Sequence, residues 1–288
     1  MAGDAKSRLR WHLKAEQAFG LRSVPRPAGD NASEVAALSE SHCADESDRP
    51  EPPPPVAPVV RPTAAKSSKV DALFAPDPDA PAFNAPSLSP DDKRRRLIAL
   101  DENEVRGCTK CRLCETRTNT VFGVGDPNAT LFFIGEGPGE NEDLRGEPFV
   151  GRAGELLNKW IAAMGLTREQ VYIANIVKCR PPNNREPAPD ETATCTPYLQ
   201  RQLEIIRPRV IMTLGKPSSQ YMLQSKLSMG KLRGQWHEYR GIKLMPTYHP
   251  AYVLRQYTVE TRRAVWDDLQ KVMSELGLPI PKPRKTES

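Results

Sequence analysis

Four cysteines constrain the fold of this chain more than any other feature. They are spaced as C-x2-C, a gap of 67 residues and then C-x15-C, at Cys108, Cys111, Cys179 and Cys195. Thiolate is a soft ligand, and four thiolates suit an iron–sulfur cluster or a structural zinc ion. The spacing ties an N-terminal segment to a loop deep in the domain. We therefore expect a metal centre that holds the loops at one end of the fold in place.

The remaining cysteines and the absence of export signals indicate the compartment. Cys114 follows Cys111 by three residues, so a C-x2-C-x2-C arrangement is also possible, and Cys43 is expected to be a free thiol. The first residues carry charges but no apolar core typical of a secretory signal. No stretch approaches the ~20 apolar residues that a membrane span needs. We expect a cytoplasmic protein, in a reducing environment, without a membrane partner.

Composition divides the 288 residues into segments. Fourteen of the 29 prolines lie between Pro25 and Pro90, in a stretch without hydrophobic periodicity. Such a stretch cannot bury enough apolar surface to offset its chain entropy. We expect a short amphipathic segment that is either a docking helix or a frayed terminus, then a long disordered Pro-rich linker, a globular domain and a basic tail. Their bounds are 1–20, 21–90, 91–278 and 279–288.

The charge is concentrated in the globular part. Residues 1–90 hold 10 Lys and Arg against 12 Asp and Glu, which leaves 31 against 24 in residues 91–288. The whole chain is +5, whereas the part from residue 91 is +7. This excess favours a polyanionic partner.

Strand and helix patterns alternate from residue 91 onward. Short apolar runs predict strands at 130–135, 171–177, 210–215 and 241–249, and helical periodicity predicts helices at 91–107, 154–165, 189–206 and 259–276. This alternation is typical of an open parallel sheet with helices on both faces. We expect one α/β domain of three layers around a central, mostly parallel four-stranded sheet.

The polar loops follow these strands. The glycine-rich GEGPGENED (135–143) follows the first predicted strand, Asn175 lies near the end of the second, and His249 follows the fourth. The carboxyl ends of parallel strands share one edge of a sheet, where open α/β folds place ligand crevices. The sequence therefore predicts that these loops meet at a single site.

Each of these residues also has a structural interpretation. Asn175 either caps a strand end or reads an amide-like edge of a ligand, and His249 is either structural or part of the site. Phe149, in PFVG, either packs in the core or stacks on a planar ligand. Among the clustered carboxylates of 136–143, Glu136 directly follows the strand-end glycine and is expected to point inward.

Taken in order, four motifs resemble those of the iron–sulfur (type 4) uracil-DNA glycosylases. They are GEGPGENED, EPFVGRAGELL, NIVKCRPPNNREP and HPAYVLR, and with the cysteine spacings the resemblance covers residues 95–278. It implies a [4Fe–4S] cluster on Cys108, Cys111, Cys179 and Cys195, with Cys114 as a bystander. It also implies an enzyme that excises uracil from DNA and leaves an abasic sugar. We expect this enzyme to be a monomer. No motif identifies a partner for the N-terminal arm.

The resemblance assigns roles to the site residues. His249 would stabilise the negative charge of the leaving base at O2, and Glu136 would stabilise the sugar cation or orient water. The base itself would be held by the four residues Gly137, Glu142, Phe149 and Asn175. Phe149 would stack on uracil, Asn175 would read its edge, and Glu142 would crowd C5 and reject the methyl group of thymine. Leu254 or Arg255 of the HPAYVLR loop would enter the minor groove as a plug.

The sequence leaves two other functions open. One is a glycosylase of the same superfamily that acts mainly on another deaminated base, such as hypoxanthine. The other is a non-catalytic four-cysteine zinc module that binds nucleic acid, although the gap of 67 residues is unlike a compact zinc ribbon. A related branch that bonds covalently to uracil-DNA has an inserted basic loop with a histidine, and EDLRGEPFVG (142–151) has neither.

Overall fold

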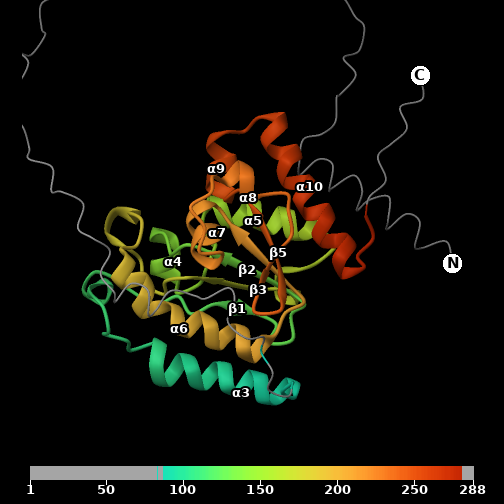
Figure 1. Cartoon of the computed structure of the whole chain (residues 1–288). Helices are drawn as coiled ribbons and strands as arrows, with labels where there is room; N and C mark the ends of the chain where they lie inside the picture. The colour runs from blue at the N-terminus through green and yellow to red at the C-terminus, as the bar shows by residue number, and fades with distance from the viewer. Residues whose placement is uncertain (1–82, 84–86, 281–288) are drawn as a thin grey trace, which may run out of the picture. The chain divides into compact units, whose positions relative to one another are not determined.

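The computed structural model describes residue 83 and residues 87–280. The expected amphipathic segment 1–20, nearly all of the linker 21–90, Cys43 and most of the tail 279–288 lie outside the described residues, so these expectations remain predictions. From α3 onward the described chain is built of strands and helices interspersed along the sequence, as Figure 1 shows.

A six-stranded mixed sheet forms the centre of the described part (Figure 1). Its order is β1-β3-β2-β4-β6-β5. The four predicted strands are its parallel core: β2 (Leu131–Gly135), β3 (Tyr172–Asn175), β4 (Val210–Leu214) and β6 (Ile242–Thr247). The α/β prediction is confirmed, with two strands more than expected.

The two additional strands are short antiparallel edges. They are β1 (Val124–Gly125), which pairs with β3, and β5 (His237–Tyr239), which pairs with β6. With two and three residues they are too short for a period-2 pattern to show. β1 forms by pairing with a strand distant in sequence, whereas β5 forms a hairpin with β6, joined by Arg240 and Gly241.

Side chains alternate between two apolar cores along each central strand. In β2, Phe133 pairs in register with Ile173 and belongs to one core, while Phe132 pairs with Tyr172 and belongs to the other. Because both faces are covered, every residue of β2 is buried. Such strands read as continuous apolar runs, which is why they were recognisable in the sequence.

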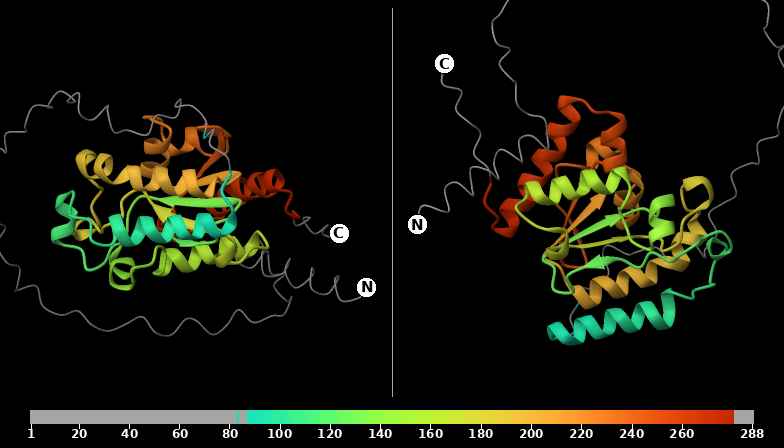
Figure 2. Two further views of the ribbon diagram at one scale, coloured as in Figure 1. Left: turned by 90° about the horizontal axis from the view of Figure 1, so that it is seen from below. Right: turned by 180° about the vertical axis from the view of Figure 1, so that it is seen from behind.

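Helices cover both faces of the sheet, as Figure 2 shows from behind. On one side lies α6 (Pro189–Ile206), with α3 (Pro90–Leu100) packed against it; α3 continues into a π-helical turn, Asp101–Val105. On the other side lie α5 (Arg152–Ala163) and α10 (Val259–Leu276). These four helices agree with the predicted ones, and they complete the expected three layers.

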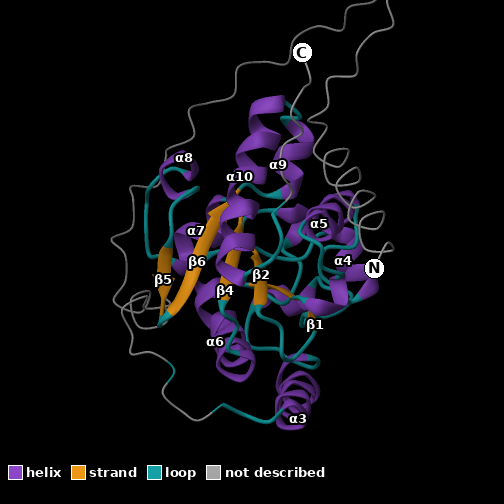
Figure 3. Ribbon diagram, turned by 90° about the vertical axis from the view of Figure 1, so that its right-hand side faces the viewer, coloured by secondary structure: helices purple, strands orange, loops and turns teal. Residues whose placement is uncertain are grey.

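Four short α-helices of the described residues were not predicted. They are α4 (Glu140–Arg145), α7 (Lys216–Met222), α8 (Met229–Leu232) and α9 (Pro250–Arg255). Three of them begin just after a parallel strand ends: α4 after β2, α7 after β4 and α9 after β6 (Figure 3). They form the wall of the sheet edge where the polar loops meet. Within residues 87–280, none of the helices has the length and apolarity to cross a membrane.

Candidate active site

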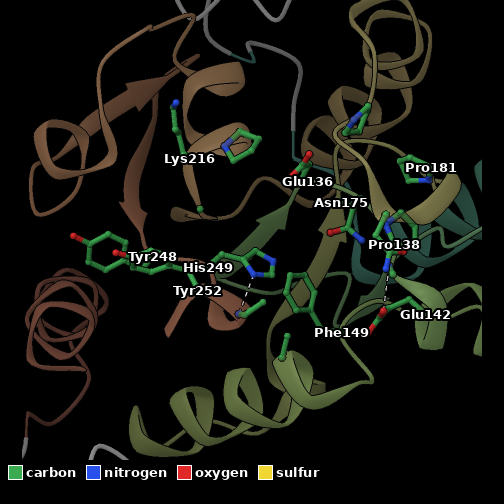
Figure 4. Close-up of a pocket in the computed structure, with 18 of the residues that line it drawn as sticks. Glu136, Pro138, Glu142, Phe149, Asn175, Pro181, Lys216, Tyr248, His249 and Tyr252 are labelled. Carbon is green, nitrogen blue, oxygen red and sulfur yellow. Dashed lines mark hydrogen bonds between the residues drawn. The ribbon is translucent and has the colours of Figure 1, made fainter. Parts of the chain in front are cut away.

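A cleft of about 820 Å³ opens at the carboxyl ends of the parallel strands. Figure 4 shows how residues from separate loops point into it. Seven residues singled out from the sequence line this one cleft: Glu136, Gly137, Glu142, Phe149, Asn175, His249 and Arg255. The expected convergence of the polar loops is therefore present in the fold.

Asn175 is the most informative residue of the cleft. It ends β3, its side chain is only 1% exposed, and Oδ1 has no hydrogen-bond partner within the described part of the chain. A buried polar atom without a partner costs about 1–3 kcal/mol. Gly135 makes room for it, because a Cβ there would lie 2.3 Å from Asn175 Oδ1. The arrangement fits a ligand that donates a hydrogen bond to this amide oxygen.

His249 presents a defined tautomer. It is the N-cap of α9, and its Nδ1 accepts a hydrogen bond of 3.0 Å from the backbone N–H of Ala251. The proton of the neutral ring must then be on Nε2. Burial, with a smaller contribution from Arg255, lowers the pKa of His249 to about 4. At neutral pH the residue is therefore an uncharged hydrogen-bond donor.

Phe149 is held in a strained backbone conformation. It is 6% exposed, and its φ of 53° lies in the left-handed region that residues other than glycine rarely adopt. Its ring lies 5.6 Å from that of His249, tilted by 33°. Gly154 is required here, because a Cβ would lie 1.9 Å from the Phe149 carbonyl oxygen. Such strain, on the order of 1–3 kcal/mol, persists where surrounding contacts enforce it.

Glu142 supplies those contacts. Its Oε1 accepts hydrogen bonds from the backbone N–H groups of Val150 (2.8 Å) and Gly151 (3.0 Å), and Oε2 accepts one from Gly139 (3.1 Å). Both carboxylate oxygens thus hold the backbone on either side of α4 and next to Phe149. The structure gives Glu142 a positioning role, and its predicted contact with C5 of the base remains a prediction.

Glu136 lies half-buried just after β2 and lines the cleft. Burial, and then the nearby Glu186, raise the pKa of Glu136 to about 7. It can therefore exchange a proton near neutral pH. Gly137 beside it packs tightly, because a Cβ there would lie 2.7 Å from Val177.

The two predicted DNA-contacting residues differ. Arg255 is exposed and lines the cleft. Leu254 is half-buried and packs against the apolar core beneath α5 and α10, and it does not belong to the cleft lining. Tyr252, in the same helix, does line the cleft and is 39% exposed. Exposure thus favours Arg255 over Leu254 as the plug, which remains a prediction.

Comparison with known proteins agrees with this geometry. The family model of the uracil DNA glycosylase superfamily matches residues 122–270. The type-4 uracil-DNA glycosylase of Saccharolobus solfataricus is 49% identical over 189 residues, covering 62% of this chain and 87% of that protein. The chain belongs to the uracil-DNA glycosylase superfamily.

Further relatives place it among the type-4 members of that superfamily. The type-4 enzyme of Thermotoga maritima is 46% identical over 183 residues, covering 63% of this chain and 95% of the relative. A type-5 uracil-DNA glycosylase of Pyrobaculum aerophilum is 28% identical over 166 residues, covering 52% and 71%. The higher identity and coverage lie with type 4.

The four cysteines of this superfamily member meet at one place. Cys108, Cys111, Cys179 and Cys195 line one small cavity between the segment after α3, the loop after β3 and α6. Cys114 does not line it. Over residues 83 and 87–280, no three Cys, His, Asp or Glu side chains are placed as ligands of a single ion.

Hydrogen-bond donors surround the thiols. Cys179 Sγ lies 3.1 Å from a guanidinium nitrogen of Arg117, and Cys195 Sγ lies 3.2 Å from the backbone N–H of Lys178. Burial raises the pKa of Cys179 to about 11 and that of Cys195 to about 12. Four thiols around one cavity, with N–H donors directed at two of the sulfurs, are the donor set that suits an iron–sulfur cluster.

Lys178 connects the cysteines to the cleft, and the sequence analysis missed it. It is 1% exposed, and Nζ donates to the Asn175 carbonyl oxygen (2.9 Å) and to Gln202 Oε1 (2.6 Å). Its backbone N–H bonds to Cys195. The available signal in the sequence was the position of this lysine between an apolar strand and a cysteine. A lysine buried at such a position needs several hydrogen-bond partners, which indicates a structural role.

Proposed function

We propose that this chain is a DNA-repair enzyme that flips uracil out of DNA and hydrolyses its N-glycosidic bond. The observation that carries the proposal is the buried amide oxygen of Asn175, which has no partner among the described residues and lies near Phe149, whose ring contacts His249. The type-4 uracil-DNA glycosylases at 46–49% identity support it. The product is an abasic sugar in an otherwise intact strand.

Recognition begins with extrusion of the base, because the glycosidic bond of a stacked base is out of reach. The extruded uracil stacks on Phe149. Its N3–H donates to Asn175 Oδ1, and its O4 accepts from the Asn175 amide N–H₂. Cytosine offers an acceptor at N3 and a donor at C4, so it leaves both groups unpaired. Sites that hydrogen-bond their substrate reject such analogues strongly.

Bond cleavage places negative charge on the departing base and positive charge on the sugar. The Nε2–H of His249 donates to O2 of the base and stabilises the first charge. Because the ring is neutral, it acts as a fixed electrostatic donor and not as an acid. The carboxylate of Glu136 stabilises the second charge or orients the water that attacks C1′.

The pH dependence of kcat/KM tests the role of Glu136. The pKa of Glu136 is about 7 in the free protein, and its active form is the carboxylate. We expect kcat/KM to rise with pH through about 7 and then level off, because deprotonation above the pKa supplies the charge. In Glu136→Gln this limb should disappear along with most of the activity. A limb unchanged in Glu136→Gln would assign the titration to another group.

Removal of the Glu142 carboxylate should loosen the Phe149 loop. In Glu142→Ala three backbone N–H groups lose their acceptor, so we expect the free energy of unfolding to fall by about 1.5–3 kcal/mol. Misplacement of the stacking ring should lower kcat/KM by about 10- to 100-fold. Chemical denaturation and steady-state kinetics measure both effects. Glu155→Ala, at an exposed position of α5, is the matched control. Wild-type kcat/KM in Glu142→Ala would contradict the positioning role.

The cavity between the segment after α3, the loop after β3 and α6 is proposed to hold a [4Fe–4S] cluster on Cys108, Cys111, Cys179 and Cys195. The cluster would supply structural cross-linking among three segments, and the reaction described above needs no change of its redox state. Lys178 donates hydrogen bonds both to Cys195 Sγ and to the carbonyl oxygen of Asn175. The loop that carries Lys178 and Cys179 therefore also supports Asn175, which reads the base.

Cytoplasmic location and a monomeric state belong to the same proposal. None of the five cysteines within the described residues forms a disulfide with another, which suits a reducing compartment. The net charge of +7 from residue 91 onward suits contact with DNA phosphates.

Excision by the purified protein tests the proposed function. End-labelled oligonucleotides with one uracil, hypoxanthine, cytosine or thymine are incubated with the protein, and abasic sites are revealed by alkaline cleavage. We expect cleavage at uracil and release of free uracil. Preferential release of hypoxanthine would favour the other superfamily activity, and binding without release of any base would favour a non-catalytic module.

A further inference from the structure

A series of contacting side chains runs from the core to the cleft. It starts at Asp268, which is fully buried and accepts two hydrogen bonds of 3.0 and 2.8 Å from Arg233. The guanidinium of Arg233 lies 5.5 Å from the centre of the Tyr248 ring. Tyr248 in turn stacks on Tyr252, with centroids 5.0 Å apart and planes inclined by 29°. Each side chain is therefore held in place by the preceding one, and Tyr252 is the outermost.

The ring of Tyr252 is accessible to a ligand. Tyr252 is 39% exposed, and both tyrosines line the cleft that contains Asn175 and His249. Figure 4 shows the two tyrosines on the far side of His249 from Asn175. They therefore lie in the cleft but outside the pocket assigned to the extruded base.

Cations of α9 and α7 also line the cleft. Arg255 follows Tyr252 by one helical turn, and Lys216 lines the same cleft at the start of α7. An aromatic platform flanked by cations is the arrangement by which proteins hold single-stranded nucleic acid, with bases on the rings and phosphates on the cations. A core role alone would not require an exposed ring on a charged cleft.

We propose that Tyr252, supported by Tyr248 and Arg233, is a stacking platform for the nucleobase next to uracil on the same strand. This inference rests on the proposed function. When uracil leaves the stack, its neighbour loses a stacking partner, and the Tyr252 ring replaces it. Part of the cost of base extrusion is thereby recovered. Lys216 would hold a flanking phosphate, and Arg255 would keep its predicted place as the plug.

The stacking platform is tested by a double-mutant cycle that combines substitution of Tyr252 with removal of the neighbouring base from the oligonucleotide. The probe is a single-stranded oligonucleotide with one 2′-fluoro-deoxyuridine, whose glycosidic bond resists cleavage. In two further oligonucleotides a tetrahydrofuran abasic unit replaces the base on the 5′ or the 3′ side. Dissociation constants are measured for the wild type, Tyr252→Leu, Tyr252→Phe and Tyr257→Leu. Tyr257 is also exposed and contacts an arginine, but it does not line the cleft, so it is the matched control.

The wild type should lose about 5- to 150-fold in affinity when the neighbouring base is removed on one side, as for loss of one base–aromatic stack. Tyr252→Leu should bind the intact oligonucleotide more weakly by a similar factor and show no further loss with the abasic unit on that side. Tyr252→Phe and Tyr257→Leu should behave as the wild type. The proposal is supported if, on either the 5′ or the 3′ side, the abasic unit weakens binding by the wild type but not by Tyr252→Leu.

Two results would overturn it: equal losses for Tyr252→Leu on intact and abasic oligonucleotides, or no loss at all. Excision of uracil by the wild type is measured beforehand on an ordinary deoxyuridine oligonucleotide. Failure of that reaction rejects the proposed function, whereas excision without coupling at Tyr252 rejects only the platform.

Discussion

His249→Ala should lower the single-turnover rate of uracil excision by about 100- to 1,000-fold, which is typical for loss of one oriented donor to a developing negative charge. The affinity for uncleaved uracil-DNA should change much less, because the donor is needed chiefly in the transition state. The measurements are rapid-quench cleavage at saturating enzyme and binding to the cleavage-resistant 2′-fluoro oligonucleotide.

His249 also caps α9, so its replacement could act through the helix. His249→Asn separates the two roles, because asparagine is a good N-cap but does not carry a donor at the position of Nε2. We expect a similar loss of rate with α9 intact. His237→Ala, on β5 and outside the cleft lining, is the matched control. Weaker binding with an unchanged rate at saturation would make His249 a substrate-positioning residue.

Cys179→Ser should abolish the iron–sulfur cluster. The wild-type protein, purified without added metal, should be brown, with charge-transfer absorption and about four irons per chain. The variant should lose iron and colour, and its melting temperature should fall by at least about 10 °C, since loss of a structural metal centre costs several kcal/mol. Metal analysis, visible absorption and thermal unfolding measure these effects.

Cys114→Ser is the matched control, because Cys114 lies near the ligands in sequence but does not line their cavity. It should keep the iron and the stability of the wild type. Stoichiometric zinc in the wild-type protein, or full iron content in Cys179→Ser, would overturn the assignment of the cluster.

The long, buried elements of the fold could be predicted from the sequence, whereas the short ones could not. The strand of 171–177 and the helix of 189–206 were recognisable because a buried strand is apolar throughout and a long helix repeats its apolar face. The edge strands β1 and β5 and the short helices α4, α7, α8 and α9 have too few residues for either period to appear. β1 pairs with a strand far away in sequence, whereas β5 forms a hairpin with the adjacent strand β6.

The sequence by itself determined the α/β class, the meeting of the polar loops at one sheet edge and the spacing of the four cysteines. These follow from local periodicity and from the geometry that all parallel strands share. The family resemblance added the uracil-excision activity.

Only the tertiary structure decided what each side chain contacts. It showed that Asn175 Oδ1 is buried and that Glu142 holds the backbone beside Phe149. It also placed Leu254 against the core and Tyr252 in the cleft. The physical reason is that hydrogen bonding, burial and stacking depend on groups brought together from distant parts of the chain, and no local pattern of residues records these neighbours.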